Sequence, residues 1–367
     1  MLMGCAKAAP VMTPVATALP AAGSWMGLGG EEMGVEEVAK KAAGADYVLI
    51  GEGHDSACDH AAQAALVKAL VDAGRPPAVG FEMIPVGYAE VLGEFNKGRI
   101  SVAALPEVLD WEESWGFPFA LYEPIFRVAD ENGLPVYALN VPSALARKVG
   151  KEGMDGVSAE ERAMLPATII PPLKEQRKML RQVFESHPGE RDDAAFERFM
   201  TVQSLWDTVM AENAVAARKA SGRPVAVIAG AGHVEYGWGI AHRLRTLDPG
   251  AKIFVAMPWR AAPGEELAGA EAFFYCPQQH KSRMGMLLED RGGRVVVAAV
   301  VPGSRAQKAG LAAGDVVVEA QGLPVAALAD MHDAGFKAHE DKAPFVLTVE
   351  RAGTRLTIDL GRLGEGN

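Results

Sequence analysis

Short apolar runs alternate with longer helical segments between about residues 31 and 262. The runs are 47–50, 78–81, 135–139, 225–229 and 253–256. Each contains little polar alternation, which is typical of strands buried on both faces of a parallel sheet. Helical segments such as 61–73 lie between the runs, and a longer helical insertion of roughly 157–220 is expected to form a cap. The pattern therefore predicts an α/β domain with a doubly wound, mainly parallel sheet.

Carboxylate and imidazole side chains follow three of these runs. Glu52 and His54 come after the first run, Glu82 after the second and His233 after the fourth. Ligands of open α/β sheets bind outside the carboxyl ends of the strands, so we expect the four side chains to converge on one crevice. Such a set can ligate a divalent metal or divide general acid and base roles. The alternative is that each is a solvated loop residue.

One helix is expected to face the same crevice. Its apolar side recurs at spacings of three and four residues through Phe196, Met200, Gln203, Asp207, Met210 and Ala214. Gln203 and Asp207 interrupt this side with polar groups. Buried polar groups need hydrogen-bond partners, so both should point at the site or at a strand end. If the helix is turned slightly, both would instead be half exposed.

Aromatic residues are concentrated between residues 111 and 126, where two tryptophans, three phenylalanines and one tyrosine occur. Such a surface could hold a flat apolar ligand. Clusters of this kind are more often ordinary core, so the concentration alone does not predict a ligand.

Composition excludes some classes of protein and leaves others open. The net charge of −11 is too acidic for a protein that binds the nucleic-acid backbone, whereas 49% hydrophobic residues suffice for a sizeable core. No window has the 18 to 20 apolar residues, approximately, of a membrane-spanning helix, so any membrane contact would be through a tether. Cys5, Cys58 and Cys276 show no paired spacing of a zinc site or disulfide framework, which leaves the redox compartment open.

The first residues suggest such a tether. Leu2-Met3-Gly4-Cys5 resembles the lipobox at which bacterial lipoproteins are cleaved and acylated on the cysteine. No basic region and no apolar region precede it, so the match is incomplete and chance is the alternative. The following Ala-, Pro- and Gly-rich residues have almost no charge or periodicity, and we expect 1–30 to form a flexible tether with a lipid anchor at Cys5.

Several motifs of the α/β domain, 31–262, together resemble the ChaN-type haem-binding lipoproteins. They are Gly51-Glu52-Gly53-His54-Asp55, Gln63, Phe81-Glu82-Met83, the aromatic segment 111–122, residues 138–142, the helix around 203–210 and residues 229–234. The resemblance implies an iron-regulated bacterial lipoprotein that binds haem and serves haem or iron uptake. It also implies a location in the cell envelope, anchored on the periplasmic side or in the periplasm. The best known form of the family is a homodimer with two haems facing each other.

Tyrosine and histidine are the expected axial donors to haem iron. The residues predicted to contact the cofactor are His54, Tyr88, Tyr122, Gln203, Asp207, His233 and Tyr236. His60, His187 and His242 lack a comparable context and are interpreted as surface or packing residues.

Erythromycin esterases and Tiki-type metal-dependent peptidases resemble this domain in the Gly-Glu-x-His step at Glu52 and His54, the second-strand Glu82 and the late His233. This resemblance keeps a hydrolase as the alternative function. Glu52 or Glu82 would then be the catalytic base. Glu52, His54, Glu82 and His233 would be the metal ligands if the enzyme is metal dependent.

A second, smaller domain is expected over 281–363, after a Pro-, Gly- and Ala-containing linker, 263–280. Met284-Gly285-Met286-Leu287 resembles the carboxylate-binding loop and strand of bacterial PDZ domains, and residues 300–311 and 314–317 resemble the core of that family. The resemblance implies a β-rich module that binds peptides. A peptide would add as a strand, and amide donors near Gly285 and Met286 would hold its C-terminal carboxylate. The alternative is that the module packs on its neighbour and binds nothing.

Overall fold

The computed structural model describes residues 19–186, 192–260 and 268–363. They form two compact units, the first mainly over 23–258 and 268–274 and the second mainly over 275–363. The expected lipid anchor at Cys5 and the residue His187 lie outside the described residues. Within the described ranges, no helix combines the length and the apolar character needed to cross a bilayer.

The first unit is built on an eight-stranded sheet with the order β2-β1-β8-β7-β3-β6-β4-β5. Its central strands are β3 (Tyr47–Glu52), β4 (Ala78–Pro85), β5 (Val136–Asn140), β6 (Val225–Gly230) and β7 (Ile253–Trp259). They correspond to the five predicted apolar runs. β3 pairs with β6 and β7, and β4 pairs with β5 and β6, all in parallel. The predicted α/β class with a mainly parallel sheet is confirmed.

Three short strands extend one edge of this sheet. They are β1 (Trp25–Gly27), β2 (Glu32–Met33) and β8 (Ala272–Tyr275), and β1 pairs antiparallel with both β2 and β8. The sequence assigned residues 25–27 to the flexible tether and residues 272–275 to the linker. In the structure both segments are strands that pair with each other. Trp25 is buried, and its ring lies 5.0 Å from that of Phe274.

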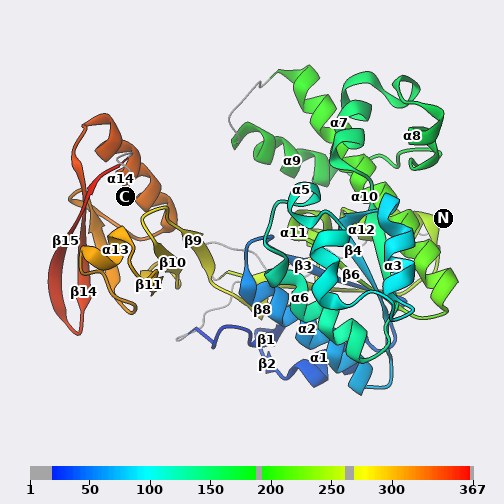
Figure 1. The fold of residues 1–367 in the computed structure, drawn as a ribbon, viewed down its shortest axis with the longest axis horizontal. Helices are drawn as coiled ribbons and strands as arrows, with labels where there is room; N and C mark the ends of the chain where they lie inside the picture. Colours follow the sequence, from blue (N-terminus) through cyan, green and yellow to red (C-terminus); the bar gives the residue numbers. More distant parts are fainter. Residues whose placement is uncertain (1–18, 187–191, 261–267, 364–367) are drawn as a thin grey trace, which may run out of the picture. The chain divides into compact units, whose positions relative to one another are not determined.

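Helices surround the strands and form the predicted insertion. The helices are α1 (Val35–Ala42), α2 (Ala57–Asp72), α3 (Ala89–Phe95), α4 (Leu105–Val108), α5 (Trp111–Ser114), α6 (Phe119–Glu131), α7 (Ser143–Glu152), α8 (Ala159–Ala163), α9 (Lys174–Ser186), α10 (Asp193–Ser221), α11 (Ala231–Val234) and α12 (Ile240–Leu247). Short 3₁₀ turns are η1 (Val86–Tyr88), η2 (Val102–Ala104), η3 (Met154–Gly156) and η4 (Glu235–Gly237). In Figure 1, α7, α8 and α9 gather beyond the strands at the top of this unit. This insertion has small apolar clusters of its own, in which Leu145 of α7 groups with Leu205 of α10, and Leu180 of α9 with Phe196 of α10.

The second unit is an antiparallel sheet with two helices. Its strands are β9 (Gln278–Lys281), β10 (Met286–Asp290), β11 (Val295–Val300), β12 (Val316–Ala320), β13 (Leu323–Pro324), β14 (Pro344–Arg351) and β15 (Thr354–Arg362), and its helices are α13 (Arg305–Lys308) and α14 (Leu328–Glu340). The order is β15-β14-β12-β11-β10-β9, with β13 beside β12. Alternate side chains of β14, among them Leu347 and Val349, enter a core that α14 covers with Met331 and Ala334. This is the small β-rich domain that the sequence predicted.

Candidate functional site

The sheet order brings the predicted site residues together. β6 lies between β3 and β4, so the carboxyl ends of these three strands are neighbours. Glu52 ends β3 directly opposite Gly230, the last residue of β6, and Glu82 lies in the adjacent strand β4. His54 follows β3 by two residues, and His233 lies in α11 directly after β6. Residues that are far apart in the sequence therefore share one rim of the sheet.

Glu52 and His54 form the first of two carboxylate–imidazole pairs. Nδ1 of His54 lies 2.7 Å from Oε1 of Glu52. The Glu52 carboxylate is fully buried, whereas 34% of the His54 side chain is exposed. Burial raises the pKa of Glu52, and the hydrogen bond to His54 offsets only part of this effect. Burial lowers the pKa of His54, but the hydrogen bond and charge of Glu52 outweigh it, so the net shift is upward.

The second carboxylate oxygen of Glu52 lies in an unusual environment. Oε2 is buried and has no hydrogen-bond partner within the described part of the chain. The nearby Nε2 atom of His60 is 3.8 Å away, beyond hydrogen-bonding distance. Buried oxygens are almost always hydrogen-bonded, so Oε2 of Glu52 retains an unused acceptor position.

Aromatic side chains surround His54. The ring of Trp115 meets that of His54 nearly edge-on at 4.8 Å, and the ring of Phe117 lies 5.3 Å away. The buried Tyr122 supports this group, because its hydroxyl accepts a hydrogen bond from Nε1 of Trp115 at 3.0 Å and lies 3.4 Å from the carbonyl of His54. Burial raises the pKa of Tyr122 well above its usual range, with the charge of Glu52 adding to the effect. The partly exposed imidazole thus lies among flat apolar surfaces.

The second carboxylate–imidazole pair is His233 with Asp207, and the carboxylate of Glu82 lies on the other side of the same imidazole. Its Nδ1 atom lies 2.7 Å from Oδ1 of Asp207, and its Nε2 atom lies 3.5 Å from Oε1 of Glu82. Burial lowers the pKa of His233, but the two carboxylates outweigh burial and raise it to about 9. His233 is therefore a buried imidazolium at neutral pH, with both ring nitrogens facing carboxylates.

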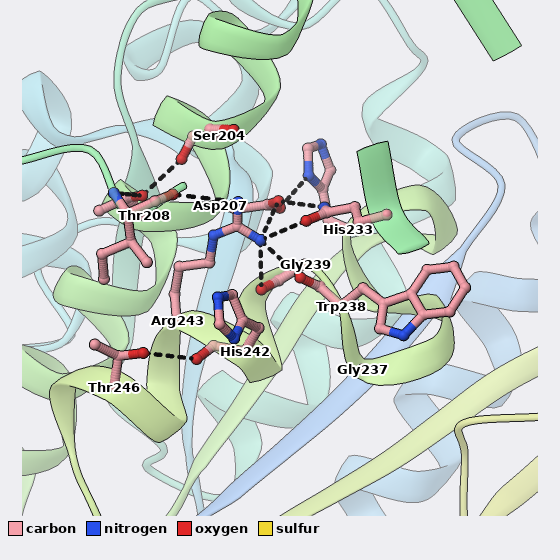
Figure 2. Close-up of polar contacts among 12 residues, drawn as sticks. Ser204, Asp207, Thr208, His233, Gly237, Trp238, Gly239, His242, Arg243 and Thr246 are labelled. Carbon is pink, nitrogen blue, oxygen red and sulfur yellow. Dashed lines mark hydrogen bonds and ion pairs between the residues drawn. The ribbon is translucent and has the colours of Figure 1, made fainter. Parts of the chain in front are cut away.

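Figure 2 shows that Asp207 lies between His233 and the guanidinium of Arg243. Nη1 of Arg243 is 3.3 Å from Oδ2 of Asp207 and donates to Oε1 of Gln176 at 2.7 Å. Gln176 in turn donates from Nε2 to Oδ2 of Asp207 at 2.9 Å. All three side chains are buried. This network fixes the carboxylate of Asp207, which then orients His233.

Gly230 separates the two pairs. Its amide donates to Oε2 of Glu82 at 2.7 Å. A Cβ at this position would lie 2.7 Å from Cε1 and 3.2 Å from Nε2 of His54, so only glycine leaves room for the imidazole here.

The four predicted metal ligands do not form a ligand cage in this arrangement. Among the described residues, no three of Glu52, His54, Glu82 and His233 have ligand atoms within 4.8 Å of one another. The reason is that each imidazole is hydrogen-bonded to a carboxylate rather than turned toward a shared point. The geometry matches acid–base pairs better than metal coordination.

Other predicted cofactor residues lie at the edge of this site or apart from it. The Tyr88 hydroxyl donates to Asp110 at 3.1 Å on an exposed surface. Tyr236 has a positive φ of 56° and stacks on Trp238 at 4.4 Å. Gln203 is only partly buried, one helical turn before Asp207, so the expectation that both point inward holds for Asp207 alone.

Some residues of the site were missed by sequence reasoning. His60 was interpreted as surface or packing, yet it is fully buried beside Glu52, with Nδ1 3.1 Å from Oε1 of Gln63. His60 and Gln63 are spaced three apart on one face of α2, a signal that could have placed them together. Gln176 and Arg243 have no comparable signal, because they meet Asp207 from separate helices.

The predicted peptide-binding residues lie at the start of β10. Met284 and Gly285 form the preceding loop, and Gly285 has a φ of +84° that suits glycine. Met286 is buried and Leu287 partly buried. Beside them lies a cavity of about 290 Å³. It is lined by His280, Ser282, Met284, Met286 and Leu288 and by residues of α14, including Met331, His332 and Phe336.

Comparisons with known proteins follow this division of the chain. Residues 38–244 match the family model described as haem-binding uptake, Tiki superfamily, ChaN, and residues 282–361 match that of the PDZ domain. No curated protein matches the chain.

Solved structures with a similar fold include ChaN of Campylobacter jejuni, described with cofacial haem binding. The TM-score is 0.54 and the identity 18%, over 68% of this chain and 95% of that one. The type III effector HopBA1 has a TM-score of 0.39 and an identity of 13%, over 66% of this chain and 92% of that one. The erythromycin esterase EreC in its open conformation has a TM-score of 0.38 and an identity of 14%, over 64% of this chain and 76% of that one. At 18% identity the similarity to the Campylobacter protein shows the fold alone.

Proposed function

This chain belongs to the haem-binding ChaN family of the Tiki superfamily, and from that premise we propose that its first unit binds haem through His54. A PDZ domain follows the haem-binding domain in the same chain. The protein would hold and present haem rather than transform it, while the PDZ module would hold a partner peptide.

The observation that carries this proposal is the hydrogen bond between Glu52 and the partly exposed His54. Donation from Nδ1 to the carboxylate leaves Nε2 as the ring atom able to bind iron, and the carboxylate increases the basicity of the ligand. Trp115 and Phe117 supply apolar surfaces next to this imidazole, as a flat macrocycle requires.

The alternative donors are less well placed. Both nitrogens of His233 face carboxylates, and the Tyr122 hydroxyl is buried in a hydrogen-bonded position. Tyr88 donates to Asp110 on the surface. Tyr236 stacks on Trp238 and is the remaining candidate to test beside His54.

A titration of the purified protein with haemin, followed at the Soret band, tests the proposal. We expect a shifted band that saturates near one haem per chain, and we expect its position to change in His54→Ala but not in Tyr236→Phe. A change only in Tyr236→Phe would transfer the axial role to that residue. No shift at micromolar haemin would refute haem binding.

We further propose that the protein works in the bacterial cell envelope, where it would serve haem or iron uptake. The sequence showed no disulfide framework, yet Cys58 and Cys276 are both disulfide-bonded. Disulfides persist in oxidising compartments such as the periplasm, which supports this location. A lipid anchor at Cys5 belongs to the same proposal. Labelling with radioactive palmitate in a bacterial host, compared with Cys5→Ala, would test it.

ChaN of Campylobacter jejuni is described with cofacial haem binding. We propose the same pairing of haems for this chain, in a homodimer that forms on haem binding. Light scattering before and after addition of haemin would show a doubling of mass. An unchanged mass would reject the dimer.

One observation favours hydrolysis as a second candidate. The buried Glu52 has a raised pKa and an oxygen, Oε2, without a hydrogen-bond partner among the described residues, as expected for a carboxylate that accepts a proton from water. Hydrolysis of p-nitrophenyl esters that falls at least about a hundredfold in Glu52→Gln would support it. Equal rates in both proteins would exclude this role.

A further inference from the structure

In the second unit, β10 is paired along both edges. β11 lies on one side and β9 on the other. In the PDZ mode of recognition a peptide adds as a strand to a free edge of the sheet. Here the register places Lys281 opposite Leu287 and His280 opposite Leu288. β9 therefore occupies the edge of β10 to which a peptide would add.

Two amide donors of the loop between these strands are satisfied within the loop. The amide of Gly285 donates to the carbonyl of Ser282 at 3.0 Å, and the amide of Met284 donates to Oγ of Ser282 at 3.2 Å. The amide of Ser282 donates to the carbonyl of Met286 at 2.9 Å. Ser282 thus supplies an acceptor to Gly285, one of the amides expected to hold a terminal carboxylate, and another to the neighbouring Met284.

β9 also contacts the helix that borders the cavity. The ring of His280 lies 4.7 Å from that of His332 on α14. His280 and Ser282 line the cavity together with Met284, Met286 and Leu288. The segment 280–282 therefore has the backbone pairing and the acceptors of a bound peptide.

We propose that β9 and Ser282 act as a built-in pseudo-ligand that occludes the PDZ groove until a partner peptide displaces them. This inference rests on the peptide-binding function proposed above. It specifies the partner as a C-terminal peptide with apolar side chains, which would fill the methionine-lined cavity and bring its own carboxylate to the loop amides near Gly285.

The properties of β9 suit displacement. The strand has only four residues, and none of its side chains is buried. Its side-chain contacts to the rest of the sheet include one hydrogen bond from Gln279 to Glu289 at 2.8 Å. A peptide with apolar side chains would gain burial in the cavity that the polar residues of β9 do not provide.

The hydrogen-bond pattern of the hairpin defines a matched pair of variants. The amide of Ser282 donates a ladder hydrogen bond to the carbonyl of Met286, and hydrogen-bonded pairs alternate along an antiparallel ladder. The amide of His280 therefore points at β10 and that of Lys281 points away. His280→Pro should release β9, whereas Lys281→Pro keeps the inward donors and serves as the control.

Heptapeptides with apolar C-terminal residues, prepared as free acids and as amides, are the probes for fluorescence anisotropy with the full chain. We expect His280→Pro to bind the free acids at least about tenfold more tightly than the wild type and Lys281→Pro do, and to prefer acids over amides. Equally tight, acid-selective binding by the wild type would overturn occlusion while leaving peptide binding intact. Absence of binding in all three proteins would refute the peptide-binding function and occlusion with it.

Hydrogen exchange of the wild type tests the occlusion independently of the variants. Without peptide, the amide of Gly285 and the inward amides of β9 should be protected. On addition of a bound free-acid peptide, exchange in 278–281 should accelerate while β10 stays protected. Unprotected β9 amides in the peptide-free protein would overturn the proposal.

Discussion

His233 and Asp207 meet at 2.7 Å between Nδ1 and Oδ1, although one follows the strand β6 and the other belongs to the long helix α10. The contact ties α10, which begins in the helical insertion, to the rim of the sheet. Nη1 of Arg243 lies 3.3 Å from the other oxygen of the carboxylate, so a cation faces the buried Asp207 on that side. The orientation of His233 thus depends on residues outside the strand ends.

The charge of His233 should make stability depend on pH. A folded-state pKa of about 9, against an ordinary value of 6.5, contributes roughly 3 kcal/mol to the unfolding free energy. Because the pKa is raised, this contribution is complete below pH 6.5 and is lost as the pH rises through 9. Urea denaturation from pH 6 to 9.5 should show this loss, and Asp207→Asn should reduce it. If the unfolding free energy falls equally steeply with pH in the wild type and in Asp207→Asn, the carboxylate of Asp207 does not raise the pKa of His233.

Nuclear magnetic resonance provides the direct measurement. The Cε1–H signal of His233 should titrate near pH 9 in the wild type and at a lower pH in Asp207→Asn, because one of the two carboxylate charges is removed. A midpoint near 6.5 in the wild type would show that the carboxylates do not hold the proton.

Removal of Arg243 should destabilise the first unit. The guanidinium is fully buried and contacts Asp207, Gln176 and the carbonyl of Trp238. Arg243→Met would remove the guanidinium from the buried contact with Asp207, and loss of one partner of a buried ion pair typically costs about 3–5 kcal/mol. Arg99→Met, which removes an exposed partner of Glu94, is the control and should change the urea midpoint little. Similar midpoints in both variants would show that the buried network is unimportant.

The sequence predicted the central strands and the meeting of four side chains because both follow from strong rules. Buried parallel strands have continuous apolar runs, and ligands gather at their carboxyl ends. The sequence did not show that β6 lies between β3 and β4, and this order brings Glu52, Glu82 and His233 together.

What the sequence missed depended on contacts between distant segments. Trp25 lies in a stretch that resembles a spacer, and it becomes part of a strand only because β8 pairs with β1. Residues 278–280 of β9 were assigned to a linker, since the four polar residues of this strand have no strand pattern of their own. Arg243 has no sequence signal of its own, because the partners that it meets, Asp207 and Gln176, lie on other helices.

The charge of Glu52 should strengthen haem binding. Glu52→Gln keeps the size and an acceptor for Nδ1 of His54 but removes the negative charge that increases the basicity of the imidazole. Changes in such outer partners typically cost about 10- to 100-fold in metal affinity, so haem affinity should fall within that range. The exposed Glu94→Gln is the control in the same Soret titration. Unchanged affinity in Glu52→Gln would argue against His54 as the iron ligand.

Gly230 offers the most direct test of the site geometry, because a single methyl group would enter it. Gly230 has an ordinary backbone conformation, so alanine adds no backbone strain there. The new Cβ would lie 2.7 Å from Cε1 of His54 and 3.6 Å from Oε2 of Glu82. Gly230→Ala should therefore push the imidazole of His54 out of its position beside Glu52 and weaken haem binding by at least about tenfold, in the range typical of disturbed ligand orientation.

Gly232→Ala is the matched control, two residues along the chain. A Cβ at Gly232 meets nothing within 4 Å, so this variant should bind haemin like the wild type. Thermal unfolding of both variants separates displacement of His54 from general destabilisation, since a loss of haem binding with a nearly unchanged midpoint points to the imidazole. If Gly230→Ala binds haemin with wild-type affinity and an unaltered Soret band, His54 does not hold the iron from the position seen here.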